Sequence, residues 1–254
     1  MNRFPLIFNH YLKRNLADPM SIVFYFLMPI GLIVLNMLGS IGLFQLSGDY
    51  DSANLTATAT FLAVIFMVSF QFFSGELIIH NIYGELRGPV SSRLFVSPVP
   101  QRTFIMGCAV SCWVFNIIQA LVIFIVTAIF FDVYWGNPLV FIAVLLLISI
   151  MSQLIGALIS ILVPTRKVAS GILNGLAFLM MFLSGMLFIS FGDSPIATFI
   201  TSYATPLALG FRAILFAGPV FDDMSRAMFN LGILTVITVV LGFIVFVLGR
   251  RRSL

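Results

Sequence analysis

The fold is decided by the stretch Val133–Thr165, VYWGNPLVFIAVLLLISIMSQLIGALISILVPT, which runs for 33 residues without a charged side chain. A helix needs about 20 residues, at 1.5 Å per residue, to cross the ~30 Å hydrocarbon core of a bilayer. Five further uncharged stretches of suitable length are present, at 19–48, 52–75, 103–131, 168–192 and 227–249. The pattern predicts an all-α polytopic membrane protein with six transmembrane helices.

The composition excludes a soluble globular protein. Of the 254 residues, 61% are hydrophobic and 9% are charged, and the mean hydropathy is +1.14, whereas soluble domains carry about 25% charged residues. The net charge of +4 comes from residues that punctuate apolar runs, so we expect no nucleic-acid partner. Cys108 and Cys112 fit neither a zinc pattern nor a redox motif, and we expect no metal site.

The charge distribution predicts the topology of a single domain, 1–254. We place the spans at 20–44, 55–79, 103–131, 138–163, 168–190 and 227–249. With both termini cytoplasmic, eleven of the 13 basic residues lie inside and only Arg212 and Arg226 lie outside. This arrangement satisfies the positive-inside rule at every loop.

A seventh uncharged stretch, 194–211, is interpreted differently from the spans. It is rich in Ser and Thr, and counting it as a span would put the Arg250–Arg252 run outside the cell. Pro195 and Pro206 suit the first turns of two short helices, and Gly218 suits a helix end. We therefore predict an extracellular re-entrant helical hairpin at 194–217, before the last span.

The N-terminal segment 3–17 is predicted to form an amphipathic interfacial helix. On a helical wheel its apolar residues collect on one half, and Arg3, Lys13 and Arg14 lie on the other. We expect that it is not a signal peptide, because the following apolar run is far longer than a signal h-region and lacks a cleavage site. A basic, solvated leader is the alternative.

The cytoplasmic loop 82–100 is too polar to span the membrane. Pro89 can open a short helix that presents an apolar face beside charged flanks, as expected of a segment that docks into a groove on a soluble partner. A loop whose arginines are held by lipid phosphates is the alternative, and these residues leave both readings open. The residues concerned are Glu85, Arg87, Val90, Arg93, Leu94 and Phe95.

Other candidate residues each allow two interpretations. Gly171 and Gly175 form a GxxxG pattern that permits close helix approach, either between two subunits or within one. Glu76 is a functional candidate as an intramembrane carboxylate, but we expect it at the inner headgroups. We interpret Cys108 and Cys112 as small packing residues, while Arg212 either reaches lipid headgroups or lines an outer vestibule.

Three function classes are weighed against these features. A secondary transporter is expected to carry ionisable residues at mid-membrane and often has inverted repeats, and neither is visible here. An intramembrane enzyme needs a nucleophile or a metal cluster, and His10 and His80, both in cytoplasmic positions, do not assemble one. A non-transporting assembly factor or sensor stays open on physical grounds.

The loop and the first span resemble those of ABC-2 type transporter permeases. The run Gly84-Glu85-Leu86-Arg87-Gly88, followed by Leu94-Phe95-Val96-Ser97-Pro98, looks like the family's E-R-x-x-G…L…SP loop. The opening Leu16-Ala17-Asp18-Pro19, with Met28-Pro29 in the first span, is similar to drug-exporter-like members of that family. The plan of leader, six spans and outer hairpin also matches.

This resemblance implies a non-catalytic permease subunit of an ATP-driven exporter in a plasma membrane, which we expect to be bacterial. It implies two cytosolic ABC ATPase subunits that bind ATP and Mg, and a second permease subunit, identical or different. It further implies ATPase coupling through the loop residues named above and a dimer seam that includes the helix of Gly171 and Gly175. The cargo is expected to be a drug, a peptide antibiotic or a lipid, and the runner-up functions are a secondary transporter or an assembly or sensor protein.

The two lysines of the sequence are consistent with an ATPase on a separate chain. A phosphate-binding P-loop needs Gly-Lys-Ser/Thr, whereas Lys13 follows Leu12 and Lys167 follows Arg166. We therefore expect no cofactor on this chain.

Overall fold

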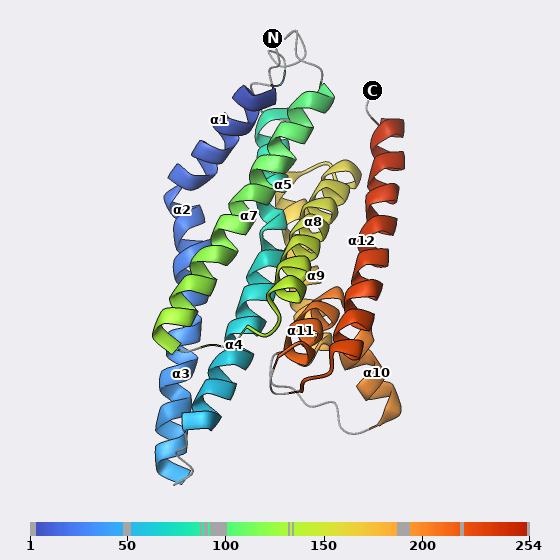
Figure 1. Cartoon of the computed structure of the whole chain (residues 1–254). Coiled ribbons are helices and arrows are strands. Elements are labelled where there is room, and N and C mark those ends of the chain that lie inside the picture. Colours follow the sequence, from blue (N-terminus) through green and yellow to red (C-terminus); the bar gives the residue numbers. More distant parts are fainter. Residues whose placement is uncertain are drawn as a thin grey trace.

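The computed structural model describes residues 4–47, 52–86, 88, 91, 101–131, 133, 135–186, 194–218 and 221–252. All regular elements in these ranges are helical (Figure 1). They are α1 (Phe4–Ala17), α2 (Pro19–Ile22), the π-helical turn η1 (Val23–Leu27), α3 (Met28–Ser47), α4 (Ser52–Phe73), α5 (Gly75–Leu86), α7 (Gln101–Phe131), α8 (Pro138–Leu162), α9 (Arg166–Leu183), α10 (Pro195–Tyr203), α11 (Pro206–Phe216) and α12 (Met224–Arg252).

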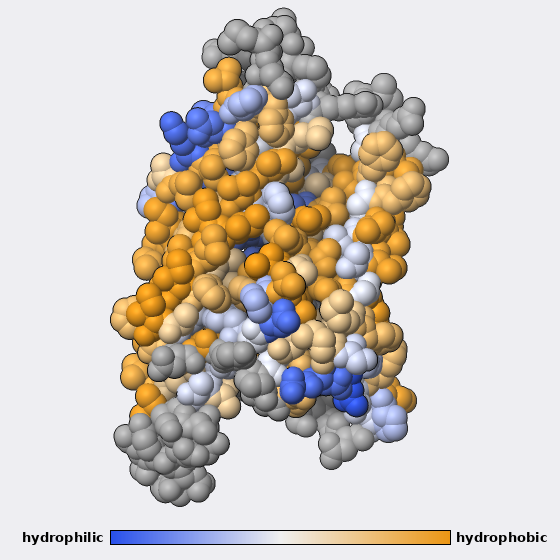
Figure 2. Space-filling model, viewed as in Figure 1, coloured by the Kyte–Doolittle hydropathy of each residue, from blue (hydrophilic) through white to orange (hydrophobic). Residues whose placement is uncertain are grey.

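Six of the described helical segments are long and apolar enough to span a bilayer. They run over Pro19–Ile41, Thr56–Glu85, Thr103–Phe131, Pro138–Leu162, Arg166–Leu183 and Met224–Gly249. Apolar residues cover most of the side of the bundle, and strongly hydrophilic ones gather toward its two ends (Figure 2). The predicted all-α membrane protein with six spans is confirmed.

Three helices begin at the same local sequence pattern, a capping residue followed by proline. Asp18 accepts hydrogen bonds from the backbone of Met20 and Ser21, Asn137 accepts one from Leu139, and Thr205 accepts one from Ala208. The cap satisfies a backbone amide that has no partner within the helix, and proline has no amide hydrogen to leave unpaired. Helices α2, α8 and α11 therefore begin where their sequences predict.

The beginning of α1 and the end of α12 lie at the same end of the bundle, here named the terminal end (Figure 1). The short helices α10 and α11 lie at the opposite end, here named the hairpin end. Between its packed neighbours α4, α8, α9 and α12, α11 buries Leu207, Leu209 and Phe211. The hairpin thus fills one end of the bundle core, and its outer location relative to a membrane stays a prediction.

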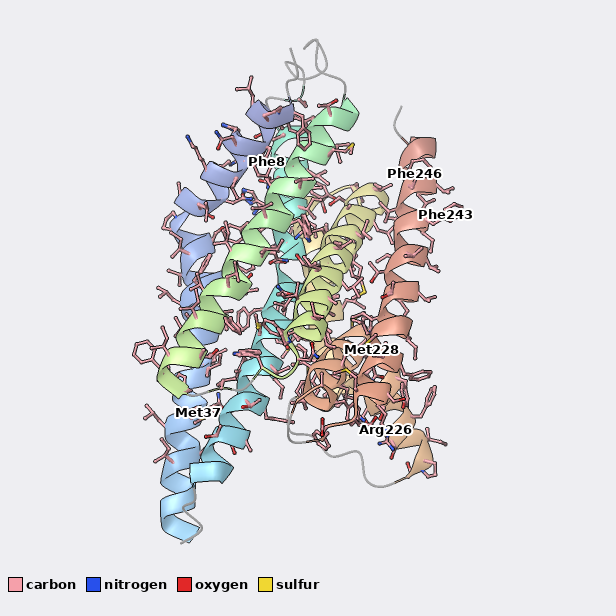
Figure 3. The ribbon with its side chains drawn as sticks, viewed as in Figure 1. Phe8, Met37, Arg226, Met228, Phe243 and Phe246 are labelled. Atoms are coloured by element: carbon pink, nitrogen blue, oxygen red, sulfur yellow. The ribbon has the colours of Figure 1, made fainter. Side chains whose placement is uncertain are left out.

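The second span is the buried centre of the bundle, and the last span lies at its edge. Helices α3, α7, α8, α9 and α11 all pack against α4, whereas α12 exposes Phe243 and Phe246, which point away from the other helices (Figure 3). Burial on all sides explains why the second span carries so few charges and why periodicity alone does not reveal its neighbours.

Helices α5 and α8 approach each other more closely than side chains normally allow. A Cβ atom at Gly156 would lie 2.5 Å from the backbone oxygen of Gly75, and one at Gly75 would lie 2.6 Å from the backbone oxygen of Ser152. Glycine at both positions lets the two backbones touch, as small residues do at membrane helix interfaces. The sequence analysis did not single out this pair.

Several element boundaries differ from the predicted ones. Helix α5 continues to Leu86, so the first residues of the predicted loop 82–100 are helical. Helix α9 ends at Leu183, before the predicted end of the fifth span at residue 190. Two breaks inside spans were not predicted either. The second span is interrupted at Ser74, where neighbouring helices pack against it, and the first span contains η1, just before Pro29.

We predict that Gly156→Ala destabilises the protein, because the added methyl group overlaps the Gly75 carbonyl. Overpacking of this kind typically costs about 1–3 kcal/mol. The matched control is Gly232→Ala in α12, where a Cβ meets nothing within 4 Å. Thermal unfolding in detergent should show a lower melting temperature for Gly156→Ala alone. Equal melting temperatures would contradict close α5–α8 packing.

Candidate functional site

The end of α5 is tied to α1 by an ion pair. Arg14 Nη1 lies 2.7 Å from Glu85 Oε1, in the last turn of α5. The Arg14 side chain is 38% exposed and that of Glu85 is 17% exposed, so water partly screens the pair. The carboxylate at the start of the predicted coupling segment is therefore oriented by the N-terminal helix.

Helix α1 packs along α7 and has a buried face there. The Tyr11 and Phe104 rings meet edge to face with centroids 5.5 Å apart, and a Cβ at Gly107 would lie 2.7 Å from Ile7 Cγ2. Burial, together with the nearby Glu85 carboxylate, raises the pKa of the Tyr11 phenol well above its ordinary value. The amphipathic pattern of 3–17 thus has a protein partner on its apolar side, and its contact with lipid headgroups stays a prediction.

Cys112 joins three helices at the terminal end. Its sulfur accepts a hydrogen bond from Asn81 Nδ2 of α5 at 3.2 Å and a longer one from Asn15 Nδ2 of α1 at 3.7 Å. Cys108 and Cys112 are both buried free thiols. The sequence analysis treated the cysteines as packing residues and missed both asparagines, which lie next to charged or polar residues, Arg14 and His80, and so do not stand out in the sequence.

We name this arrangement the inner junction. It consists of Tyr11, Arg14, Asn15, Asn81, Glu85, Phe104 and Cys112. The junction holds α1, α5 and α7 together at the end where α5 leads into the loop toward α7. A force on that loop would therefore act on three helices at once.

Only one of the six predicted coupling residues is described by the structure. Glu85 lies in the inner junction. The other five, Arg87, Val90, Arg93, Leu94 and Phe95, lie outside the described residues. Their roles stay predictions.

Gly171 and Gly175 lie on an open face of α9. A Cβ at either glycine meets nothing within 4 Å, and both are exposed. The opposite face of α9 buries Ala169, Leu173 and Ala177 against the bundle. The sequence left open whether the two glycines pack closely within this subunit. The structure shows that they do not pack against the described residues of this subunit.

Glu76 links the second and fifth spans. Its Oε1 accepts a hydrogen bond from the Ser170 hydroxyl of α9, beside Gly171. Ser170 is only four residues from the start of α9, where Arg166 and Lys167 lie. The position of Glu76 relative to a membrane surface stays a prediction.

Two arginines, Arg212 and Arg226, lie at the hairpin end. Arg226 forms an ion pair with Asp223 at 2.9 Å, whereas Arg212 of α11 is half-buried and forms no ion pair within the described residues. The two interpretations of Arg212, lipid headgroups or an outer vestibule, both stay open. Among the described residues, no three His, Cys, Asp or Glu side chains form a group that could hold a metal ion.

Comparison with known families gives one match. Residues 43–247 match the family described as "ABC-2 family transporter protein". The matched region begins near the end of α3 and reaches into the last span, so it covers five of the six spans and the hairpin. No curated protein matches the chain.

We predict that reversing either charge of the Arg14–Glu85 pair loosens α1 from α5. Because the pair is partly screened, each single change, Arg14→Glu or Glu85→Arg, should cost below about 1 kcal/mol. The double variant restores an ion pair with reversed polarity, and its thermal unfolding should return toward that of the unmodified protein. Additive losses in the double variant would show that the two side chains do not interact.

Proposed function

Because the chain belongs to the ABC-2 transporter family, we propose that it is the membrane permease subunit of an ATP-driven exporter. The family match over residues 43–247 carries the proposal, and the six apolar spans support it because a permease must itself cross the membrane. The chain is thus a multi-pass membrane protein and a transport component. Export as the direction, and a bacterial plasma membrane with both termini cytoplasmic, are the finer parts of the proposal.

We place the ATPase on separate polypeptides. The chain has two lysines and neither follows a glycine, so it lacks the sequence that would cradle the phosphates of ATP. Two cytosolic ABC ATPase subunits would bind ATP and Mg and drive alternating access. In this proposal the permease contributes binding and motion, without catalysis.

The coupling segment is proposed to begin at Glu85. Helix α5 ends at Leu86 and the chain re-enters the bundle with α7 at Gln101, so residues 87–100 connect two helices that are joined at the inner junction. Val90, Leu94 and Phe95 would supply apolar anchors to an ATPase groove, while Arg87 and Arg93 would supply charged flanks.

A second permease subunit is proposed to pack on the open face of α9. This face exposes Ile172, Phe178 and Phe182 around the two glycines. A small-xxx-small pattern without a partner in its own subunit suits close approach to a helix of another copy. The cargo is proposed to be hydrophobic or amphipathic, such as a drug, a peptide antibiotic or a lipid, as the family resemblance implies.

Truncation of the proposed anchors tests the coupling role. We predict that Leu94→Ala/Phe95→Ala leaves membrane insertion intact, because no span changes, but lowers recovery of the co-purified ATPase at least tenfold. Transport should fall with it. The control is Arg87→Gln/Arg93→Gln, which should have the larger effect on insertion if the loop is instead held by lipid phosphates. Full ATPase recovery and transport by the Leu94/Phe95 variant would refute coupling through this loop.

Bulky substitutions on α9 test the dimer. We predict that Gly171→Leu and Gly175→Leu each weaken self-association or association with a sibling permease, because leucine holds the helix backbones apart. Gly232→Leu is the matched control, since Gly232 is also exposed with nothing within 4 Å but lies on α12. Subunit association can be followed by energy transfer between labelled permeases in vesicles. Unchanged association of both α9 variants would mean that this face contacts lipid.

A further inference from the structure

Uncharged polar side chains form a buried cluster halfway along three spans. We name it the mid-span polar cluster, which consists of Gln71, Ser74, Asn116, Ser149, Ser152 and Gln153. Apart from Gln153, which is 5% exposed, each is at most 1% exposed. At 1.5 Å per residue, these positions lie within about 6 Å of the centres of their spans.

The cluster surrounds a break in the second span. Helix α4 ends at Phe73, α5 begins at Gly75, and Ser74 between them is not helical. A break of this kind releases backbone carbonyls from the regular ladder. In a hydrocarbon environment such groups must find other partners, because lipid supplies none.

The third and fourth spans supply those partners. Asn116 Nδ2 of α7 donates to the Gln71 carbonyl at 3.4 Å, Ser152 Oγ of α8 donates to the Phe72 carbonyl at 2.8 Å, and Gln153 Nε2 donates to the Ser74 carbonyl at 3.2 Å. The backbone carbonyls of Gln71, Phe72 and Ser74 thus each receive a side-chain donor from a neighbouring helix. Within the span itself, the Ser74 hydroxyl also donates to the Gln71 carbonyl and the Leu77 amide to the Ser74 carbonyl. The break is built by tertiary contacts.

The same cluster has hydrogen-bonding capacity that this arrangement does not use. Within the described residues, both side-chain polar atoms of Gln71, Asn116 Oδ1 and Gln153 Oε1 are buried without a partner. A break that only served packing would leave fewer such groups, since each unpaired buried amide is costly. Spare donors and acceptors allow the cluster to form a second set of bonds when the helices move.

The position of the break connects it to the inner junction. Helix α5 is a 12-residue segment with Ser74 at one end and Glu85 in the last turn at the other. Because α5 is rigid and Arg14 holds Glu85, a displacement of the loop after Leu86 reaches the bundle centre through this one helix.

We propose that Ser74 is the hinge of the second span and that Asn116, Ser152 and Gln153 position it. In the arrangement described here, the three donors hold the carbonyls of the break. When α5 tilts, the three donors transfer to unused amide oxygens of the cluster, Gln71 Nε2 donates to a released carbonyl, and the span bends at its centre. The inference rests on the proposed function in one respect, that an ATPase drives the tilt of α5. The hinge itself is a property of this chain.

A reversible crosslink tests the hinge in the working transporter. The hydroxyl oxygens of Ser74 and Ser152 lie 3.3 Å apart, so Ser74→Cys/Ser152→Cys places two sulfurs close enough to form a disulfide on oxidation with copper phenanthroline. We expect the oxidised double variant to retain bound ATPase but to transport at least tenfold more slowly, with recovery after dithiothreitol. Each single cysteine variant controls for its own substitution, since without a second thiol at the break its transport should not differ between the oxidised and the reduced sample. Equal transport by the oxidised and reduced double variants would overturn the hinge.

Hydrogen exchange on the permease without ATPase separates this inference from the proposed function. We expect the backbone amides of residues 70–78 to exchange at least tenfold faster than those of residues 140–148 in α8, and to slow in the oxidised double variant. Gln153→Leu, which removes one donor, should speed exchange at the break, whereas Thr127→Val, which removes a hydroxyl bonded within its own helix, should not. Full protection of residues 70–78 would overturn the hinge even if an ATPase binds, and failure of any ATPase to co-purify would leave this measurement intact.

Discussion

Every backbone amide and carbonyl of the second span needs a hydrogen-bond partner inside the protein, and the rest of the structure depends on how that need is met. For most of its length the helix itself supplies the bonds. At Ser74 the helix is irregular, with the Ser74 amide bonded to Phe70 and the Ser74 carbonyl to the Leu77 amide, and side chains of α7 and α8 donate to the carbonyls of Gln71, Phe72 and Ser74. The two α8 donors lie at the break because Gly75 and Gly156 let the α5 and α8 backbones touch. The close packing of α5 against α8 and the hydrogen bonding of the backbone carbonyls therefore depend on each other.

The two ends of the bundle are organised by different chemistry. At the terminal end, an ion pair and two asparagine–cysteine bonds tie α1, α5 and α7 together. At the hairpin end, α11 fills the bundle with apolar side chains and begins at a Thr205–Pro206 cap. Polar bonds with defined partners fix the geometry of the terminal end, whereas apolar filling closes the core at the hairpin end.

The open face of α9 contrasts with the buried face of α5. Both helices contain glycines, but those of α5 and α8 meet each other, while Gly171 and Gly175 meet nothing in the same subunit. Glycine spacing alone does not distinguish these cases, because it permits close approach without naming the partner. The sequence analysis recognised the regular GxxxG pattern and overlooked Gly75 and Gly156, which lie on different helices and so have no spacing to recognise.

The sequence by itself determined the class of protein, the six spans, the helix beginning at Pro206 and the resemblance to the family, and the caps at Asp18, Asn137 and Thr205 are equally local although they were not predicted. These features are local: uncharged length decides whether a helix can span, and a cap acts within one turn. Only the tertiary structure decided that Glu85 pairs with Arg14, that Cys112 receives two asparagines, and that the carbonyls at Ser74 are bonded by Asn116, Ser152 and Gln153. Each of these depends on which helix faces which, and nearly uniform apolar spans carry almost no periodic signal that identifies their faces.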